Sequence, residues 1–331
     1  MSGVVVVDDF APVIDLSSGN TAAGRAEIAE AIGRSCRRSG FFTIVGHGVP
    51  QELVERMYRT TNGFFGLPAE EKDRSASVAG VSGLRKFDGK GGVPGLYEAF
   101  AAHVTGDLPE ADREALGDYP ATWKVANLWP DSPADFRATW HEYMAAMTAL
   151  SEDVMRLFAL ALDLPETFFD AKFDRHVSLL LANFYYPQRE TPPPGRIRRE
   201  SHTDWGTLTI LYQEDDLSGL QVLTDAGEWR DLPAIPGSFV VNIGDLMAFW
   251  TGGRWASTVH RVVNPEQGNT ASRISIPFFH LPNHDTSIEP IGGEFRGEGA
   301  APEFERVTVG QWFSHKMQQT FAPKLPEERV G

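Results

Sequence analysis

Residues 201–213 read SHTDWGTLTILYQ and place two potential metal ligands directly before a strongly alternating segment. His202 and Asp204 are two residues apart, so on an extended chain their side chains point to the same side and can reach one ion. The alternation over residues 207–213 predicts a β-strand. Two imidazoles and one carboxylate are the ligand set that holds a non-haem Fe(II) ion on one face. The stretch therefore predicts a metal site that needs one more histidine.

His260 is the candidate for that third ligand, because it lies in a second β-type segment, residues 257–263. A strand folded back over the first would bring it to the same ion. A lone histidine is more often an ordinary hydrogen-bonded residue, so the prediction depends on the combination of all three ligands. The other histidines have no such pairing, and we expect them to be structural or peripheral.

Arg273 and Ser275 are also two residues apart in a predicted strand and so share one of its faces. A guanidinium fork beside a hydroxyl suits a carboxylate. The alternative is a surface arginine, but the sequence IPFF that follows at residues 276–279 is typical of a protein interior. Because a buried arginine without an anion is costly, we favour the carboxylate of a ligand as its partner.

The second half of the chain has a pattern of short segments separated by turns, which is typical of a β-sandwich or barrel. The predicted strands cover residues 177–186, 207–213, 220–223, 229–232, 238–243, 246–251, 257–263 and 272–281. Helical periodicity marks residues 21–38, 51–65, 133–164 and 307–321. The expected fold class is mainly β with flanking helices, and no linker divides the chain into independent domains.

Composition and charge narrow the classes of partner. The formal net charge of -15 argues against a nucleic-acid or anionic-membrane surface, which needs a basic footprint. Cys36 is the only cysteine, which excludes an internal disulfide and a thiolate metal site and favours a reducing cytoplasm. Residues 1–9 have no basic flank and no long apolar run, so we expect neither a signal peptide nor a membrane span there. A small-molecule substrate is the expected partner, and the oligomeric state stays open.

In their order along the chain, these motifs resemble the isopenicillin N synthase-like family of Fe(II)- and 2-oxoglutarate-dependent oxygenases. The resemblance covers nearly the whole chain. The family's N-terminal region is matched by PVIDL at residues 12–16, GFF at 40–42 and GHGVP at 46–50. Its core is matched by HTD at 202–204, GLQV at 219–222, NIGD at 242–245, TGGR at 251–254, STVHRV at 257–262 and RIS at 273–275. The ordered set is specific to the family, whereas each motif alone is not.

The resemblance implies one globular unit over residues 1–331, whose core is a double-stranded β-helix, or jelly roll. Its expected parts are an N-terminal non-haem dioxygenase-like α/β region at 10–120, the oxygenase core at 176–285 and a C-terminal helix at 305–322. Within that core, His202, Asp204 and His260 are implied to hold Fe(II).

The resemblance also implies a cosubstrate site. Arg273 and Ser275 would bind the distal carboxylate of 2-oxoglutarate, and Tyr186, the tyrosine before proline, would hydrogen-bond the cosubstrate. Asn183 stands three residues before Tyr186, where the family often has an asparagine two residues before its tyrosine, so a contact of Asn183 with the cosubstrate stays open. O2 is the implied oxidant, and ascorbate an optional stimulant.

Candidates for contact with the primary substrate are Phe279, Arg85, Tyr97, Phe100 and Arg198. Phe279 lies on the same predicted strand face as Arg273, although a role in the core fits it nearly as well. The other four stand where relatives build the mouth of the pocket. For the basic run at residues 196–199, a solvated loop is the more common role.

The function that the resemblance implies is hydroxylation, desaturation or cyclisation of a small metabolite, as in natural-product biosynthesis, with release of succinate and CO2. One alternative is an iron oxidase or cyclase that needs no 2-oxoglutarate, similar to isopenicillin N synthase. There the arginine and serine would hold the carboxylate of the substrate itself. A second alternative, a metal- or ligand-binding protein without catalysis or a zinc hydrolase on a β-barrel, fits the combined motifs less well.

Overall fold

Two β-sheets form the centre of the protein. The computed structural model describes residues 10–77, 82–87, 96–116, 121–188, 195–214, 219–265, 271–292 and 305–321. The larger sheet contains, in spatial order, β1 (Val13–Asp15), β2 (Phe41–Val45), β10 (Phe239–Ile243), β7 (Leu208–Gln213), β12 (Arg273–His280), β5 (Leu179–Tyr185), β4 (Tyr97–His103) and β3 (Gly83–Lys86). Its strands pair antiparallel except β1 with β2, which are parallel.

The smaller sheet has four antiparallel strands and lies against the larger one. In spatial order they are β6 (Arg199–His202), β11 (His260–Val262), β8 (Leu220–Leu223) and β9 (Trp229–Asp231). Phe41 and Val240 of the larger sheet pack against Leu220 and Val222 of the smaller one in a shared apolar cluster. The two sheets form the predicted jelly roll. A short hairpin-like pair, β13 (Ser287–Ile288) and β14 (Val307–Thr308), lies apart from them.

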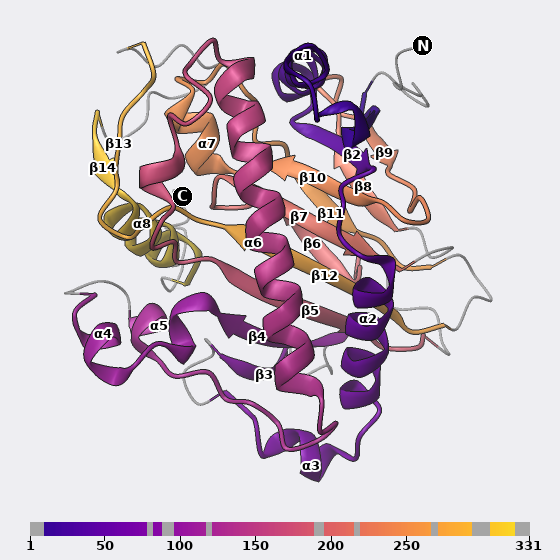
Figure 1. The fold of residues 1–331 in the computed structure, drawn as a ribbon. Helices are drawn as coiled ribbons and strands as arrows, with labels where there is room; N and C mark the ends of the chain where they lie inside the picture. Colours follow the sequence, from indigo (N-terminus) through magenta and orange to yellow (C-terminus); the bar gives the residue numbers. More distant parts are fainter. Residues whose placement is uncertain are drawn as a thin grey trace, which may run out of the picture.

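Helices cover the other face of the larger sheet. The long helix α6 (Phe136–Ala161) crosses that face, with α1 (Ala22–Arg38) and α2 (Gln51–Phe65) packed beside it (Figure 1). The remaining helices are α3 (Ala69–Asp73), α4 (Glu110–Glu114), α5 (Ala121–Lys124), α7 (Asp245–Trp250) and α8 (Val309–Phe321). Among the residues that the structure describes, no helix combines the length and apolarity needed to cross a membrane.

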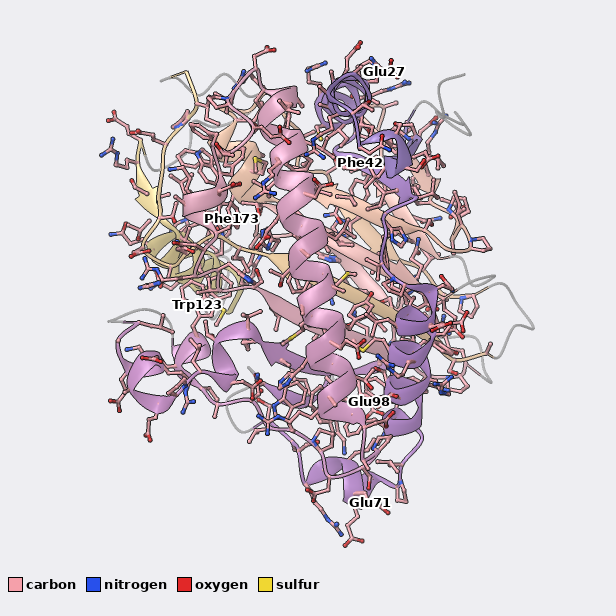
Figure 2. The ribbon with its side chains drawn as sticks, viewed as in Figure 1. Glu27, Phe42, Glu71, Glu98, Trp123 and Phe173 are labelled. Atoms are coloured by element: carbon pink, nitrogen blue, oxygen red, sulfur yellow. The ribbon has the colours of Figure 1, made fainter. Side chains whose placement is uncertain are left out.

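Alternation along the strands separates the two faces of the larger sheet. Ile274, Ile276 and Phe278 of β12 belong to the apolar cluster under the helices, while Arg273 and Ser275 point the other way, toward the smaller sheet. The helix-covered face extends over most of the length of α6: Phe42 of β2 and Glu98 of β4 lie near opposite ends of that helix (Figure 2).

Most of the predicted elements are present, with bounds that shift by a few residues. The strand predicted at residues 246–251 is wrong, because that segment is the helix α7. Its buried residues are Leu246, Met247, Phe249 and Trp250, a spacing of three and four that suits one face of a helix. The helix predicted at residues 307–321 begins two residues later, since residues 307 and 308 form β14.

Candidate metal centre and adjoining cavity

His202, Asp204 and His260 converge between the two sheets. Each offers one ligand atom, and these atoms all lie within 4.8 Å of one another. Oδ1 of Asp204 is 3.9 Å from Nε2 of His202 and 3.8 Å from Nε2 of His260. The two histidines are direct partners in the pairing of β6 with β11, which explains how residues 58 positions apart meet. A single ion placed among the three atoms can contact all of them.

Neighbouring groups fix which atom each ligand presents. Nδ1 of His202 lies 2.9 Å from the carbonyl oxygen of Glu200, and Nδ1 of His260 lies 3.1 Å from that of Thr258. A carbonyl can only accept a hydrogen bond, so each Nδ1 carries the proton and each Nε2 keeps its lone pair for a metal. The imidazoles are therefore held in the tautomer that a metal site needs.

The carboxylate of Asp204 is oriented in the same way. Its Oδ2 accepts hydrogen bonds from Thr209 Oγ1 at 2.6 Å and from Asn242 Nδ2 at 2.8 Å, which leaves Oδ1 to face the histidines. Thr209 belongs to β7 and Asn242 to β10, so the larger sheet supplies the support while the smaller sheet supplies the imidazoles. Hydrogen-bonded support of this kind is common behind metal ligands.

The backbone after Asp204 is anchored by the start of α7. The N–H of Asp245 donates to the carbonyl of Asp204 at 2.7 Å, and the N–H of Leu246 donates to that of Gly206 at 3.1 Å. This contact requires glycine at position 244, because a Cβ there would stand 2.2 Å from the Gly206 carbonyl oxygen. The NIGD motif thus holds the metal-ligand loop in place.

The side chain of Asp245 connects the loop to two further segments. It accepts hydrogen bonds from Thr203 Oγ1 at 3.0 Å and Ser257 Oγ at 2.6 Å, and pairs with Lys316 Nζ of α8 at 2.7 Å. Thr203 stands between the two ligands His202 and Asp204. The predicted C-terminal helix is therefore joined to the metal centre through one carboxylate.

The protonation states suit metal binding. Burial, the nearby Arg199 and His260 lower the pKa of His202 to about 3. Burial alone would raise the pKa of Asp204, but His260, His202 and the two hydrogen bonds described above outweigh it, so that pKa is lowered. At neutral pH His202 is neutral and Asp204 ionised, which are the forms that bind a divalent cation.

A cavity opens beside the three ligands and extends along the inner face of the larger sheet. Its walls from the larger sheet are Phe41, Asn183, Tyr185, Thr209, Leu211, Asn242, Ser275, Pro277 and Phe279. Its walls from the smaller sheet and the loop after β6 are Arg199, His202, Asp204, Leu220, His260 and Val262. The three metal ligands and Ser275 therefore line the same cavity.

Arg273 lies beside Ser275 at the inner surface of β12. It is almost completely buried, donates to Gln213 Oε1 at 3.0 Å and to the hydroxyl of Tyr185, and its guanidinium lies 5.4 Å from the Tyr185 ring centre. Asn183 is the cross-strand partner of Ser275, and its Nδ2 donates to Ser275 Oγ at 3.3 Å. Arginine, serine, asparagine and tyrosine thus meet on one inner patch.

The tyrosine on this patch is Tyr185 and not the predicted Tyr186. Tyr185 is the cross-strand partner of Arg273 and lines the cavity. Tyr186 follows the last residue of β5 and hydrogen-bonds Glu98, which is buried in an ion pair with Lys72. Adjacent residues of an extended chain point to opposite faces, so only one of the two tyrosines can face the cavity. With Tyr185 in that place, Asn183 stands two residues before it and shares its face.

The predicted substrate contacts divide between the two faces. Phe279 lines the cavity, and the strand pairing places Tyr97 opposite Tyr185 on the same inner face. Arg85 is the partner of Ala99, which is the partner of Asn183, so it too is on the inner face.

The prediction for Phe100 is wrong. It is fully buried on the helix-covered face, with ring-centre distances of 5.2 Å to Phe64, 4.9 Å to Phe136 and 5.0 Å to Trp140. Tyr97 and Phe100 are three residues apart and cannot share one face of a strand.

Arg198 is buried next to the cavity and not in a solvated loop. Its guanidinium lies 5.7 Å from the ring centre of Tyr185, and that of Arg273 lies 5.4 Å from the same centre. It donates to the carbonyl of Ala271 at 3.0 Å. Burial and the nearby Arg273 lower its pKa to about 10. Arg198 therefore strengthens the positive potential behind the inner patch.

Sequence reasoning placed Arg199 only within the basic run at residues 196–199 and did not single it out. Its side chain lines the cavity and donates from Nε to His202 Nε2 at 3.0 Å. The same reasoning missed Thr209 and Asn242 as supports of Asp204. A signal existed for both supports: Thr209 follows Thr207 by two residues in a predicted alternating strand, and Asn242 belongs to the NIGD motif. No local signal distinguished Arg199 from the other arginines of that run, since its orientation depends on the pairing of β6 with β11.

The donor set fits ferrous iron. Two imidazoles and one carboxylate from His202, Asp204 and His260 would hold the ion from one side, and this ligand set is the one found in non-haem Fe(II) oxygenases. The inner patch with Arg273 and Ser275 suits a carboxylate at some distance from the metal. A small molecule with a metal-chelating end and a distal carboxylate therefore matches both halves of the site.

Comparison with known proteins agrees with this geometry. Residues 177–282 match the family described as the 2OG-Fe(II) oxygenase superfamily, and residues 11–132 match the one described as non-haem dioxygenase in morphine synthesis N-terminal. A homoarginine-6-hydroxylase of Arabidopsis thaliana is 32% identical over 310 residues, which cover 90% of this chain and 91% of that protein. Validamycin A dioxygenase of Streptomyces hygroscopicus subsp. limoneus is 33% identical over 318 residues, with 91% and 84% covered. A full-length Neurospora crassa protein solved in complex with alpha-KG (2-oxoglutarate) superposes with a TM-score of 0.82 at 26% identity, covering 97% of this chain and 100% of that one.

Proposed function

This chain belongs to the 2-oxoglutarate- and Fe(II)-dependent oxygenase superfamily, and we propose that His202, Asp204 and His260 are its iron ligands. We further propose that Arg273 and Ser275, together with Tyr185, bind the distal carboxylate of 2-oxoglutarate. The observation that supports this proposal most strongly is that the three ligands and Ser275 line one and the same cavity. Arg273 and Tyr185 lie on the same inner face of the larger sheet.

Iron with 2-oxoglutarate and O2 supplies the oxidation itself: the cosubstrate is converted to succinate and CO2 while a C–H bond of the substrate is oxidised. The chain's own residues position the reactants. Thr209 and Asn242 keep Oδ1 of Asp204 turned toward the histidines. Arg273 supplies a planar pair of donors for a carboxylate, and its burial strengthens that interaction by excluding water.

Asn183 has a supporting role in this proposal. Its Nδ2 holds the Ser275 hydroxyl, which orients that hydroxyl toward the cavity. The spacing of two residues between Asn183 and Tyr185 places both on the inner face, beside their cross-strand partners Ser275 and Arg273. The four side chains therefore form one carboxylate-binding patch.

The primary substrate is proposed to be a small metabolite that is hydroxylated, desaturated or cyclised. The relatives named above support this, since one is a hydroxylase of homoarginine and the other a dioxygenase of validamycin A. We propose that the protein acts in the cytoplasm on such a metabolite and not on nucleic acid or at a membrane, in accord with its net charge of -15. The division into regions at residues 10–120, 176–285 and 305–322 stays a prediction.

The test is an assay of the purified protein with Fe(II), ascorbate and 2-oxoglutarate, in which succinate is measured with and without candidate substrates. We expect slow succinate formation alone and faster formation with the true substrate. His202→Ala and Asp204→Ala should each abolish Fe(II)-dependent turnover, since each removes a metal ligand. His141→Ala, which removes a half-exposed imidazole on α6, is the matched control.

Full activity in either ligand variant would refute the assignment of the iron ligands. Consumption of O2 with a substrate alone, and no succinate with any candidate, would refute the role of 2-oxoglutarate. That second result would favour an oxidase similar to isopenicillin N synthase, in which Arg273 holds the substrate's carboxylate.

A further inference from the structure

Two further arginines lie outside the patch of Arg273 and Ser275: Arg199 at the cavity wall and Arg85 on the inner face of the larger sheet. Arg199 lines the cavity from β6 and lies 3.0 Å from His202 Nε2. Arg85 of β3 is on the inner face of the larger sheet, with its guanidinium 5.2 Å from the ring centre of Phe87. Burial and the positive charge of Arg199 lower the pKa of Arg85, against an opposing effect of Tyr97.

Neither arginine has a carboxylate partner among the residues that the structure describes. Several other arginines of this acidic chain do have one: Arg25 pairs with Asp153, Arg156 with Asp170 and Arg175 with Asp285. Two partly buried, mutually repelling cations are costly without an anion. The simplest compensation is an anionic ligand in the cavity.

Metal binding makes Arg199 available to such a ligand. Nε2 of His202 has one lone pair, which can be given either to the metal or to the Nε–H of Arg199, and not to both. When His202 holds an ion, the Arg199 guanidinium has to find another acceptor nearby. It then stands at the rim of the metal site with its donors directed at the cavity.

Aromatic rings lie next to Arg85. Phe87 stacks on Tyr97 at a ring-centre distance of 4.5 Å, and Tyr97 in turn lies 5.4 Å from Tyr185. Ala99 contributes a small side chain between Arg85 and Asn183 on the neighbouring strands, and Phe279 adds an aromatic wall to the cavity. This surface suits a carbon skeleton or ring attached to the anionic group.

On the basis of the proposed function, we propose that Arg85 and Arg199 bind the carboxylate of the primary substrate, which is an apolar or aromatic carboxylic acid. Their site is separate from the patch of Arg273 and Ser275, so the substrate and 2-oxoglutarate bind together through different arginines. The anchored carboxylate fixes the distance between the substrate's carbon skeleton and the iron.

The experiment measures binding without turnover. The full chain is loaded with Zn(II) and saturated with 2-oxoglutarate, and carboxylic acids are titrated in a calorimeter beside their uncharged amides. The probes are phenylacetate, 3-phenylpropionate, cinnamate and hexanoate with the matching amides. We expect the acids that bind to do so at least about tenfold more tightly than their amides. Arg85→Gln and Arg199→Gln should each weaken acid binding about tenfold or more and leave amide binding unchanged.

Two controls separate the possible causes. Arg261→Gln removes the same charge from β11 beside His260, but there the guanidinium stacks 3.9 Å from the Trp229 ring centre, and acid binding should stay unchanged. Titration of 2-oxoglutarate into Zn(II)-loaded Arg85→Gln should give the wild-type affinity.

The proposal is overturned if amides bind as tightly as acids, if none of the acids binds, or if Arg85→Gln keeps wild-type acid affinity. It is also overturned if Arg199→Gln weakens 2-oxoglutarate and not the acids, since Arg199 would then serve the cosubstrate. Failure of the proposed function itself shows differently: wild-type protein would then bind acids but form no succinate with iron.

Discussion

The two faces of β12 and β5 have opposite characters although they belong to the same strands. Under the helices, Ile274, Ile276 and Phe278 are almost completely buried in an apolar cluster. On the inner face, Arg273 and Ser275 are just as buried but polar. Burial therefore does not distinguish the faces, whereas the chemistry of the buried side chains does.

This difference shows how the fold separates stability from function. The helix-covered face contributes free energy of folding by burying apolar area. On the inner face, burial of a guanidinium and several hydroxyl and amide groups lowers the free energy of unfolding. A ligand that completes their hydrogen bonds offsets this loss. Substitutions on the two faces should accordingly change different measured quantities.

The adjacent pair Phe278 and Phe279 tests the comparison with one type of substitution. Phe278→Ala empties a fully buried site under the helices and should lower the free energy of unfolding by about 3–5 kcal/mol. Phe279→Ala removes a partly exposed ring from the cavity wall and should cost about 1 kcal/mol of stability. Urea unfolding followed by circular dichroism measures both.

In measurements of ligand binding and turnover, the order of the two effects should be reversed. Folded Phe278→Ala should bind Fe(II) and 2-oxoglutarate as the wild type does, while Phe279→Ala should alter the response to the primary substrate. Equal destabilisation by the two substitutions would show that the inner face also carries the stability of the fold.

Removal of the Arg273 guanidinium should weaken 2-oxoglutarate binding about 30- to 100-fold, or about 2–3 kcal/mol, because a buried charge-assisted pair is lost. Arg273→Gln is the variant, and calorimetric titration of 2-oxoglutarate into Zn(II)-loaded protein is the measurement. Arg273→Lys keeps the charge without the planar fork and should recover only part of the affinity. An unchanged 2-oxoglutarate affinity in Arg273→Gln would show that the cosubstrate is bound by other residues.

The sequence was sufficient for those parts of the site that lie in short motifs. His202 with Asp204, and Arg273 with Ser275, are pairs at a spacing of two, and a strand places such pairs on one face whatever its neighbours are. The apolar run at residues 246–251 shows the limit: it reads as a strand or as a helix, and only its contact with the Asp204 loop decides for α7.

Long-range pairing decided the residues that the sequence could not place. Arg199 faces the cavity because β6 pairs with β11, a partner about 60 residues away along the chain. The choice between Tyr185 and Tyr186 depends on the register of β5 against β12, which no local pattern reveals. Phe100 differs, since its distance of three residues from Tyr97 already excluded a common strand face.

The helix-covered face also contains a polar cluster of two histidines and a serine, which predicts that the free energy of unfolding depends on pH. Ser178 Oγ lies 2.7 Å from His176 Nδ1 and 3.1 Å from His280 Nδ1, at the end of β12. Burial lowers the pKa of His176 to about 4 and lowers that of His280 as well. In the unfolded chain a histidine has a pKa of about 6.5, so below that pH the unfolded state binds more protons than the folded state.

Stability should therefore be fully present above about pH 6.5 and decline as the pH falls toward 4, with about 3 kcal/mol of the loss due to His176. His176→Gln, which keeps a hydrogen-bonding group near Ser178, should show a shallower decline over that range. Urea unfolding at several pH values measures it. Parallel curves for the variant and the wild type would mean that His176 is not the group responsible.

The smallest expected effects are those of removing the hydroxyl groups of the neighbouring residues Tyr185 and Tyr186. Tyr185→Phe removes the hydroxyl that accepts from Arg273 at the cavity and should weaken 2-oxoglutarate binding about fivefold, or about 1 kcal/mol. Tyr186→Phe removes the hydroxyl that bonds Glu98 under the helices, so it should cost a similar amount of stability and leave 2-oxoglutarate binding unchanged. Calorimetric titration and urea unfolding of both variants give the four values. If Tyr186→Phe were instead the variant with the weaker 2-oxoglutarate affinity, Tyr186 and not Tyr185 would contact the cosubstrate. The pairing of Tyr185 with Arg273 would then not describe the cosubstrate site.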